Sequence, residues 1–278
     1  LGLSASLQAA DTIITWGMFH TPPSIDLSDL NNPKGMSGEI LVTIQKGMPG
    51  YEHRNTDMSL ARIHKSIADQ VKVCNHHLFK TKKRQKIGVF SLPNRINLPL
   101  RIVLHKETHE KLGGISSISL EQFLDQSHLY GLFEKKRSYG SLDRIVKPRL
   151  EGPNIKEGVF SIEQMTSMLL QKRIDFFLEY SFLVDHLCSK SFYGTCSDLR
   201  FVAIEEAPPF AYSHVICPKN EWGEQVIKDV NAALESSVGK PEYLKILQSL
   251  YTNEQERALI REYYYGDFLG EYGPNVAQ

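Results

Sequence analysis

The segment QVKVCNHHLFKTKKRQKIGVFSLP, residues 70–93, indicates both a fold class and a first candidate site. An apolar run at 71–74 predicts a buried strand, and a second apolar run covers 87–90. Between them lie a polar loop and a basic turn around Arg84. Open α/β sheets place their ligands where strand ends open into polar loops. We therefore expect binding residues in this segment.

Arg84 is the first candidate for binding. Its guanidinium offers a planar fork of donors that matches a carboxylate in bidentate fashion. Five of the seven residues from 80 to 86 are basic, however. Such a charge run is also typical of a solvated face or a nucleic-acid patch, so the residues alone leave these interpretations open.

The composition limits the classes of protein to consider. The 278 residues allow one large domain or two lobes, and 41% hydrophobic with 23% charged residues is typical of a soluble globular chain. Lys and Arg (32) balance Asp and Glu (32), which argues against nucleic acid as the main partner. No run of 18 apolar residues occurs, so the sequence predicts no transmembrane helix.

Residues 1–10, LGLSASLQAA, have the composition of the end of a secretory signal peptide. Leu7-Gln8-Ala9 or Gln8-Ala9-Ala10 would be its small-residue cleavage site. The alternative is a disordered N-terminal tail.

The four cysteines fit an oxidising compartment, and they allow three pairings. Cys188 and Cys196 could close a small ring. The Cys-Asn-His-His run at 74–77 matches no standard zinc pattern, so we expect no metal site. The sequence carries none of the common nucleotide or hydrolase motifs, and we expect no cofactor.

The remaining pattern predicts an α/β protein. A β-branched run at 12–16 predicts a first strand, and the aromatic, proline-rich loop at 18–24 carries binding groups or is a simple turn. Ser161 with Gln164 predicts a capping box for one helix. We expect other helices at 38–48, 56–69, 221–236, 241–250 and 253–265. We expect strands at 98–104, 129–133, 174–180, 199–204 and 214–218. Residues 185–198 are expected to be loop or irregular helix.

Two further positions are candidates for ligand contact. Ser138 and Tyr139 open a predicted helix, where free N–H groups form an anion site or an ordinary N-cap. Glu179 and Tyr180 end a predicted strand, where they could meet an amine and stack on a ring, or cover the edge of the core.

The order of these segments resembles the type II periplasmic solute-binding proteins, bacterial family 3, which include amino-acid-binding proteins and related sensor domains. Residues 81–85 with 89–93 are similar to the T-x-x-R…F-S-x-P segment of the family. Residues 171–180 look like its second-lobe strand, and 216–223 look like its return strand and helix. The resemblance extends from Thr12 to about Phe268.

The resemblance implies an α/β, two-lobe periplasmic-binding-protein-like II fold with a hinge of two crossing strands. Lobe one would comprise 11–96 and 209–278, and lobe two 97–208. A ligand would bind in the cleft, with Arg84 on its carboxylate. The ligand-binding residues implied are Trp16, Phe19, His76, His77, Arg84, Ser138, Tyr139, Glu179 and Tyr180.

The resemblance also implies disulfides Cys74–Cys217 and Cys188–Cys196. His76 and His77 stand where the family often has small hydroxyl residues, and Tyr180 stands where an aspartate is expected. A plain α-amino acid is therefore not the only ligand to consider.

The function implied is that of a monomeric, periplasmic binding protein, not an enzyme, which captures a small polar, carboxylate-bearing ligand for an ABC permease or a membrane sensor. One alternative is a dehydratase-like enzyme of the same fold, with Glu179, His76 or His77 as acid or base. The other is a protein-interaction domain that has lost its ligand.

Overall fold

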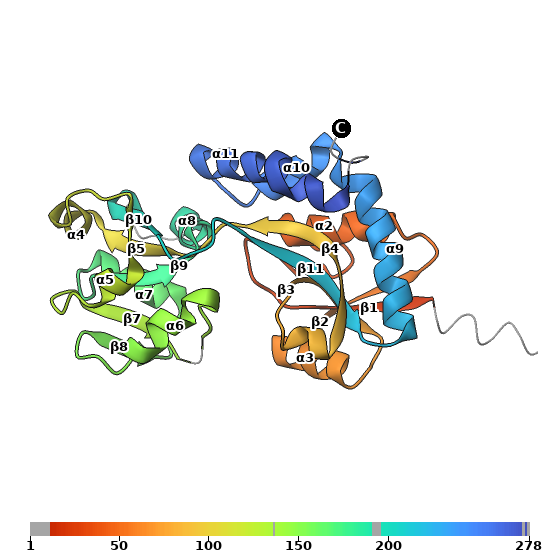
Figure 1. Ribbon diagram of the computed structural model, residues 1–278, viewed down its shortest axis with the longest axis horizontal. Coiled ribbons are helices and arrows are strands. Elements are labelled where there is room, and N and C mark those ends of the chain that lie inside the picture. Colours follow the sequence, from red (N-terminus) through yellow and green to blue (C-terminus); the bar gives the residue numbers. More distant parts are fainter. Residues whose placement is uncertain (1–11, 136, 191–195, 274–275, 277–278) are drawn as a thin grey trace, which may run out of the picture. The chain divides into compact units, whose positions relative to one another are not determined.

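The computed structural model describes residues 12–135, 137–190, 196–273 and 276. The chain divides into two compact units: unit 1 is Leu1–Asn97 with Phe210–Gln278, and unit 2 is Leu98–Pro209. Each unit contains one β-sheet with helices packed on it (Figure 1). The tail expected at 1–10 lies outside the described residues.

The sheet of unit 1 has five strands in the order β2-β1-β3-β11-β4. β1 runs parallel to both β2 and β3, whereas β11 runs antiparallel to β3 and β4. The carboxyl ends of the parallel strands β1, β2 and β3 therefore lie at the same end of the sheet. The strands are β1 (Ile13–Met18), β2 (Glu52–Asp57), β3 (Val73–Phe79), β4 (Gly88–Asn97) and β11 (Ala211–Pro218).

The helices of unit 1 begin at polar caps and bury apolar faces. The Ser59 hydroxyl accepts from the backbone N–H of Arg62 at the start of α3, which buries Ile63 and Ile67. The Asn220 side chain caps α9 in the same way. The helices are α2 (Gly35–Lys46), α3 (Leu60–Ala68), α9 (Glu221–Val238), α10 (Pro241–Gln248) and α11 (Glu254–Tyr263).

Two expectations for unit 1 were wrong. The helix expected at 56–69 starts only at Leu60, because 52–57 form β2, a polar strand that pairs with β1. The strand expected at 71–74 starts at Val73 and extends to Phe79. His76 and His77 therefore lie within β3 and not in a loop.

The sheet of unit 2 has six strands in the order β6-β10-β5-β9-β7-β8. The strands are β5 (Arg101–His105), β6 (Ser117–Ile118), β7 (Gly131–Glu134), β8 (Ile155–Gly158), β9 (Phe176–Glu179) and β10 (Leu199–Ile204). The helices are α4 (Lys106–Lys111), α5 (Leu120–Leu124), α6 (Asp143–Val146), α7 (Ile162–Leu170) and α8 (Ser181–Lys190). α8 covers residues 185–190 of the segment 185–198 that was expected to be loop or irregular helix, and residues 191–195 lie outside the described residues.

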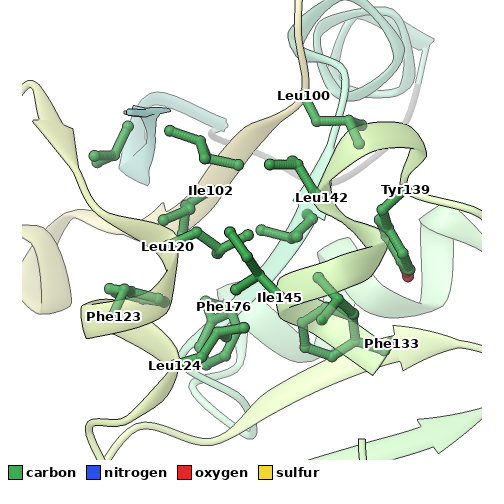
Figure 2. Close-up of a cluster of buried hydrophobic side chains, with 14 of the residues drawn as sticks. Leu100, Ile102, Leu120, Phe123, Leu124, Phe133, Tyr139, Leu142, Ile145 and Phe176 are labelled. Atoms are coloured by element: carbon green, nitrogen blue, oxygen red, sulfur yellow. The ribbon is translucent and has the colours of Figure 1, made fainter. Parts of the chain in front are cut away.

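A cluster of buried aliphatic and aromatic side chains forms a core of unit 2 (Figure 2). The ring of Phe176 packs edge-on against Phe123 at 4.8 Å and against Phe133 at 6.1 Å between centroids. Each fully buried ring contributes roughly 1.5–3 kcal/mol to folding. Tyr139 belongs to this cluster, with its ring 5.5 Å from that of Phe133.

Both disulfide pairings are confirmed. Cys74 of β3 is bonded to Cys217 of β11, and Cys188 of α8 is bonded to Cys196 ahead of β10. None of the helices in the described part of the chain combines the length and apolar character that a membrane crossing requires.

Candidate functional site

The carboxyl ends of β1 and β3 bring two predicted residues of unit 1 together. Trp16 of β1 lies opposite Cys74 of the neighbouring parallel strand β3. The residues that follow them extend beyond the same edge of the sheet, and the rings of Phe19 and His77 lie 4.7 Å apart. Both side chains keep some exposed surface. Such an edge is where open α/β sheets bind ligands.

His76 and His77 form a neutral pair in β3. Nε2 of His76 lies 3.2 Å from Nδ1 of His77. Burial lowers the pKa of His76 to about 3, and the nearby Arg95 charge acts in the same direction. Burial, with the charges of His76, Arg95 and Arg84, also holds the pKa of His77 well below its usual value. His76 is fully buried, so His77 is the member of the pair that a ligand can reach.

Arg84 begins a short 3-10 turn, Arg84–Lys86, beside the end of β3. Its Nη1 donates to the carbonyl oxygen of Phe79 (2.9 Å), and its Nε donates to Nε2 of His64 in α3 (3.2 Å). These bonds fix the guanidinium plane. Within the described chain Nη2 makes no hydrogen bond, so it remains available for a carboxylate oxygen.

Trp16 has a different position from the one expected. Its side chain has no exposed surface, and its indole N–H donates to Nδ1 of His53 (3.0 Å). Nε2 of His53 in turn contacts the carbonyl oxygen of Met48 (3.1 Å). The structure therefore places Trp16 in the core of unit 1, where it links β1 to β2 and offers no surface to a ligand.

Glu179, at the end of β9, forms a bidentate ion pair with Arg137. Oε2 accepts from Nη1 at 2.5 Å and Oε1 accepts from Nη2 at 2.6 Å. β7 and β9 are parallel neighbours, which brings the segment after β7 close to the end of β9. The Glu179 side chain is only 3% exposed and that of Arg137 is 18% exposed. The carboxylate of Glu179 is therefore satisfied within unit 2.

Other groups hold Arg137 in place. The guanidinium lies 5.3 Å from the ring centroid of Tyr139, and Nη1 is 3.6 Å from a carboxylate oxygen of Glu134. Burial would lower the pKa of Arg137, but the bond to Glu179 raises it above the ordinary value. Arg137 was not among the predicted contact residues, because the candidates in this segment began at Ser138.

Ser138 and Tyr139 are held by Asp143 in the first turn of α6. Oδ2 of Asp143 accepts from the Ser138 hydroxyl (2.9 Å), and Oδ1 accepts from the Tyr139 backbone N–H (2.7 Å). The Tyr139 hydroxyl accepts from the backbone N–H of Glu134 (3.1 Å), and its ring is buried. Of the two, only Ser138 is exposed. Tyr180 keeps some exposed surface, and its ring stacks on that of Phe182 at 5.6 Å.

The predicted residues thus form two groups. In unit 1 the accessible residues are Phe19, His77 and Arg84, at the carboxyl ends of β1 and β3. In unit 2 they are Ser138 and Tyr180, which directly follow Arg137 and Glu179 in the sequence. Among the described residues no group of three or more His, Cys, Asp or Glu side chains could hold a metal ion.

Several solved structures share this architecture. A probable amino-acid ABC transporter extracellular-binding protein of Bacillus subtilis is 18% identical, with a TM-score of 0.66 over 87% of this chain and 98% of the other. A putative L-cystine ABC transporter protein of Listeria monocytogenes is 20% identical, with a TM-score of 0.61 over 87% and 97%. The chain has the fold of the extracellular solute-binding proteins.

Further structures share this solute-binding fold. One is a Salmonella typhimurium periplasmic binding protein with high arginine specificity, 16% identical, with a TM-score of 0.59 over 87% of this chain and 99% of the other. No family model and no curated protein matches the sequence. At these identities the similarity establishes the fold of the solute-binding proteins and not the ligand.

Proposed function

We propose that the protein captures a small polar solute with a carboxylate group outside the cytoplasm, for an ABC importer or a membrane sensor. The observation that carries the proposal is the position of Arg84. Two hydrogen bonds hold its guanidinium beside the end of β3, and Nη2 is left for a ligand. The partly exposed side chains of Phe19 and His77 lie at the same end of the sheet.

The solved neighbours support this class of function. They are a probable amino-acid ABC transporter extracellular-binding protein, a putative L-cystine ABC transporter and a periplasmic binding protein. The disulfides add an independent argument, because such bonds persist in oxidising compartments. A periplasmic or extracellular location agrees with both observations.

Binding accounts for the site better than catalysis. A general acid or base must reach the proton that it transfers. Glu179 is bound to Arg137, and His76 has no exposed surface. Two of the three candidate catalytic groups are therefore engaged or inaccessible. No observation specifically supports an enzyme of this fold or a protein-interaction domain.

A thermal-shift screen of the ligand-stripped protein tests the proposal. The library would contain organic acids, amino acids, short peptides and sugars. A ligand at about 100 times its dissociation constant stabilises a protein by roughly 2.7 kcal/mol. We expect hits among carboxylates, and Arg84→Ala should abolish them.

Lys82→Ala is the matched control, because Lys82 is an exposed cation of the same basic run. Arg84→Lys keeps the charge but removes the fork, and should weaken binding while preserving the fold. Hits confined to sugars, or hits that survive Arg84→Ala, would contradict the proposal.

A further inference from the structure

We infer that unit 1 carries a second binding surface and that its partner is an anionic phospholipid membrane. This surface, the lysine face, consists of Lys80, Lys82, Lys83 and Lys86 in the connection from β3 to β4. The inference takes from the proposed function only the location outside the cytoplasm. No residue of the lysine face is among the predicted solute contacts.

The backbone beneath the lysine face forms a helical turn. The N–H of Gln85 donates to the carbonyl oxygen of Thr81 at 2.9 Å, which closes the turn. Residues three and four positions apart are neighbours on the surface of a helical turn. Lys82 and Lys83 therefore lie on the side of the turn that Lys86 occupies.

The lysines of this turn extend into solvent, whereas its arginine is held against unit 1. All four residues of the lysine face are exposed. The guanidinium of Arg84 is bonded to the carbonyl oxygen of Phe79 and to His64 of α3, and Arg84 is only partly exposed. The turn therefore presents four ammonium groups outward without using Arg84.

The elements around the lysine face contain no acidic residue. Asp and Glu are absent from β3 and β4, which the turn joins, from β11 between these strands, and from α3. The sequence contains no Asp or Glu anywhere from residue 70 to residue 106. The lysine face is therefore a local excess of positive charge in a chain whose formal net charge is zero.

This excess of charge acts on two histidines. Burial lowers the pKa of His64 in α3, and the charges of Arg84 and Lys83 lower it further. Burial also lowers the pKa of His214 in β11, where the charge of Lys80 acts in the same direction. The positive potential therefore reaches both the helix and the strand beside the turn.

A set of lysines suits a lipid surface better than one acidic protein partner. Lysine is a point charge on a flexible stem, whereas arginine has the rigid fork that recognises a carboxylate in a fixed position. Clusters of about four to eight Lys or Arg beside a membrane bind anionic lipid headgroups, and each cation strengthens binding about fivefold. The lysine face would hold the protein beside the membrane in which an importer or sensor lies.

The test is co-sedimentation of the full chain with lipid vesicles at low ionic strength. One set of vesicles is pure phosphatidylcholine, and the other also contains the anionic lipid phosphatidylglycerol. We expect the anionic vesicles to bind the protein at least about tenfold more tightly. Binding should be lost in about 1 M NaCl, where the Debye length falls to about 3 Å.

The decisive variant is Lys82→Gln/Lys83→Gln/Lys86→Gln, which removes three charges from the lysine face. Its binding to anionic vesicles should be about a hundredfold weaker than that of the wild type. Each single variant should weaken binding about fivefold, so the inference stays testable if the triple variant fails to fold.

The control is Lys228→Gln/Lys240→Gln/Lys245→Gln, which removes three exposed lysines from other parts of unit 1. Lys228 lies in α9 and Lys245 in α10, and both helices contain acidic residues. The two triple variants have the same net charge, so a difference between them reports the position of the lysines. The control should bind within about twofold of the wild type.

Three results would overturn the inference: equal binding to both kinds of vesicle, equal losses in the two triple variants, or no vesicle binding by the wild type. Binding to polyglutamate without binding to vesicles would assign the lysine face to an acidic protein instead of a membrane. The vesicles contain no solute, so none of these results bears on solute capture, which the thermal-shift screen tests separately.

Discussion

Cys74 in β3 is bonded to Cys217 in β11, and both side chains are fully buried within the sheet of unit 1. The two residues are 143 positions apart in the sequence, whereas Cys188 and Cys196 are 8 apart. In the chain-entropy account, a crosslink stabilises more when it closes a longer loop.

The first prediction concerns these disulfides. The double variant Cys74→Ala/Cys217→Ala should lose about 5 kcal/mol, and Cys188→Ala/Cys196→Ala about 2.5 kcal/mol. Thermal unfolding followed by circular dichroism would measure both. Equal losses would show that loop entropy does not set the contribution of either bond.

The second prediction concerns pH. Burial lowers the pKa of His76 to about 3, whereas an unfolded imidazole titrates near 6.5. Below about pH 6.5 the unfolded chain therefore binds more protons than the folded one. Stability contributed by neutral His76 is complete above that pH and falls as the pH drops towards 3, by up to roughly 1.4 kcal/mol per pH unit.

Urea unfolding at a series of pH values would measure this slope. His76→Gln should reduce the slope and leave the part that His77 contributes, whereas the surface variant His128→Gln should leave it unchanged. A slope that is the same in His76→Gln and wild type would rule out His76 as its source.

The third prediction compares two arginines. Arg137→Ala removes one partner from a buried pair and should cost about 3–5 kcal/mol of stability. Arg149→Ala removes a cation from exposed carboxylates and should cost about 0–1 kcal/mol. Chemical denaturation distinguishes them, and similar costs would show that the Glu179 pair is effectively solvated.

The fourth prediction separates stability from binding at Trp16. Trp16→Phe leaves Nδ1 of the partly buried His53 without its donor and should destabilise unit 1 by about 1–3 kcal/mol. The affinity for any ligand found in the screen should stay within about twofold of wild type. A larger loss of affinity would show that Trp16 contributes to ligand binding.

The sequence pattern predicted the α/β class and the capping box of Ser161 with Gln164, and the resemblance implied both disulfides. β2 escaped prediction because its residues, EHRNTD, are polar and lack the apolar alternation by which strands are recognised. Its pairing with β1 is a long-range contact that local pattern does not reveal.

The site was harder to predict than the fold. The resemblance indicated Glu179 but not its partner, because Arg137 is 42 residues away and meets it only through the parallel pairing of β7 and β9. Trp16 was expected to bind ligand because the resemblance implied it. Its hydrogen bond to His53 depends on the register of β1 against β2.

The division of the chain has a consequence for the order of events at synthesis. Residues 98–209 are contiguous, so unit 2 holds all its strands before β11 has been made. The sheet of unit 1 stays incomplete until β11 pairs with both β3 and β4. Cys74 must wait for Cys217, and Cys188 and Cys196 emerge in the meantime as two wrong partners. Closure of the short Cys188–Cys196 ring before Cys217 emerges would remove both wrong partners of Cys74.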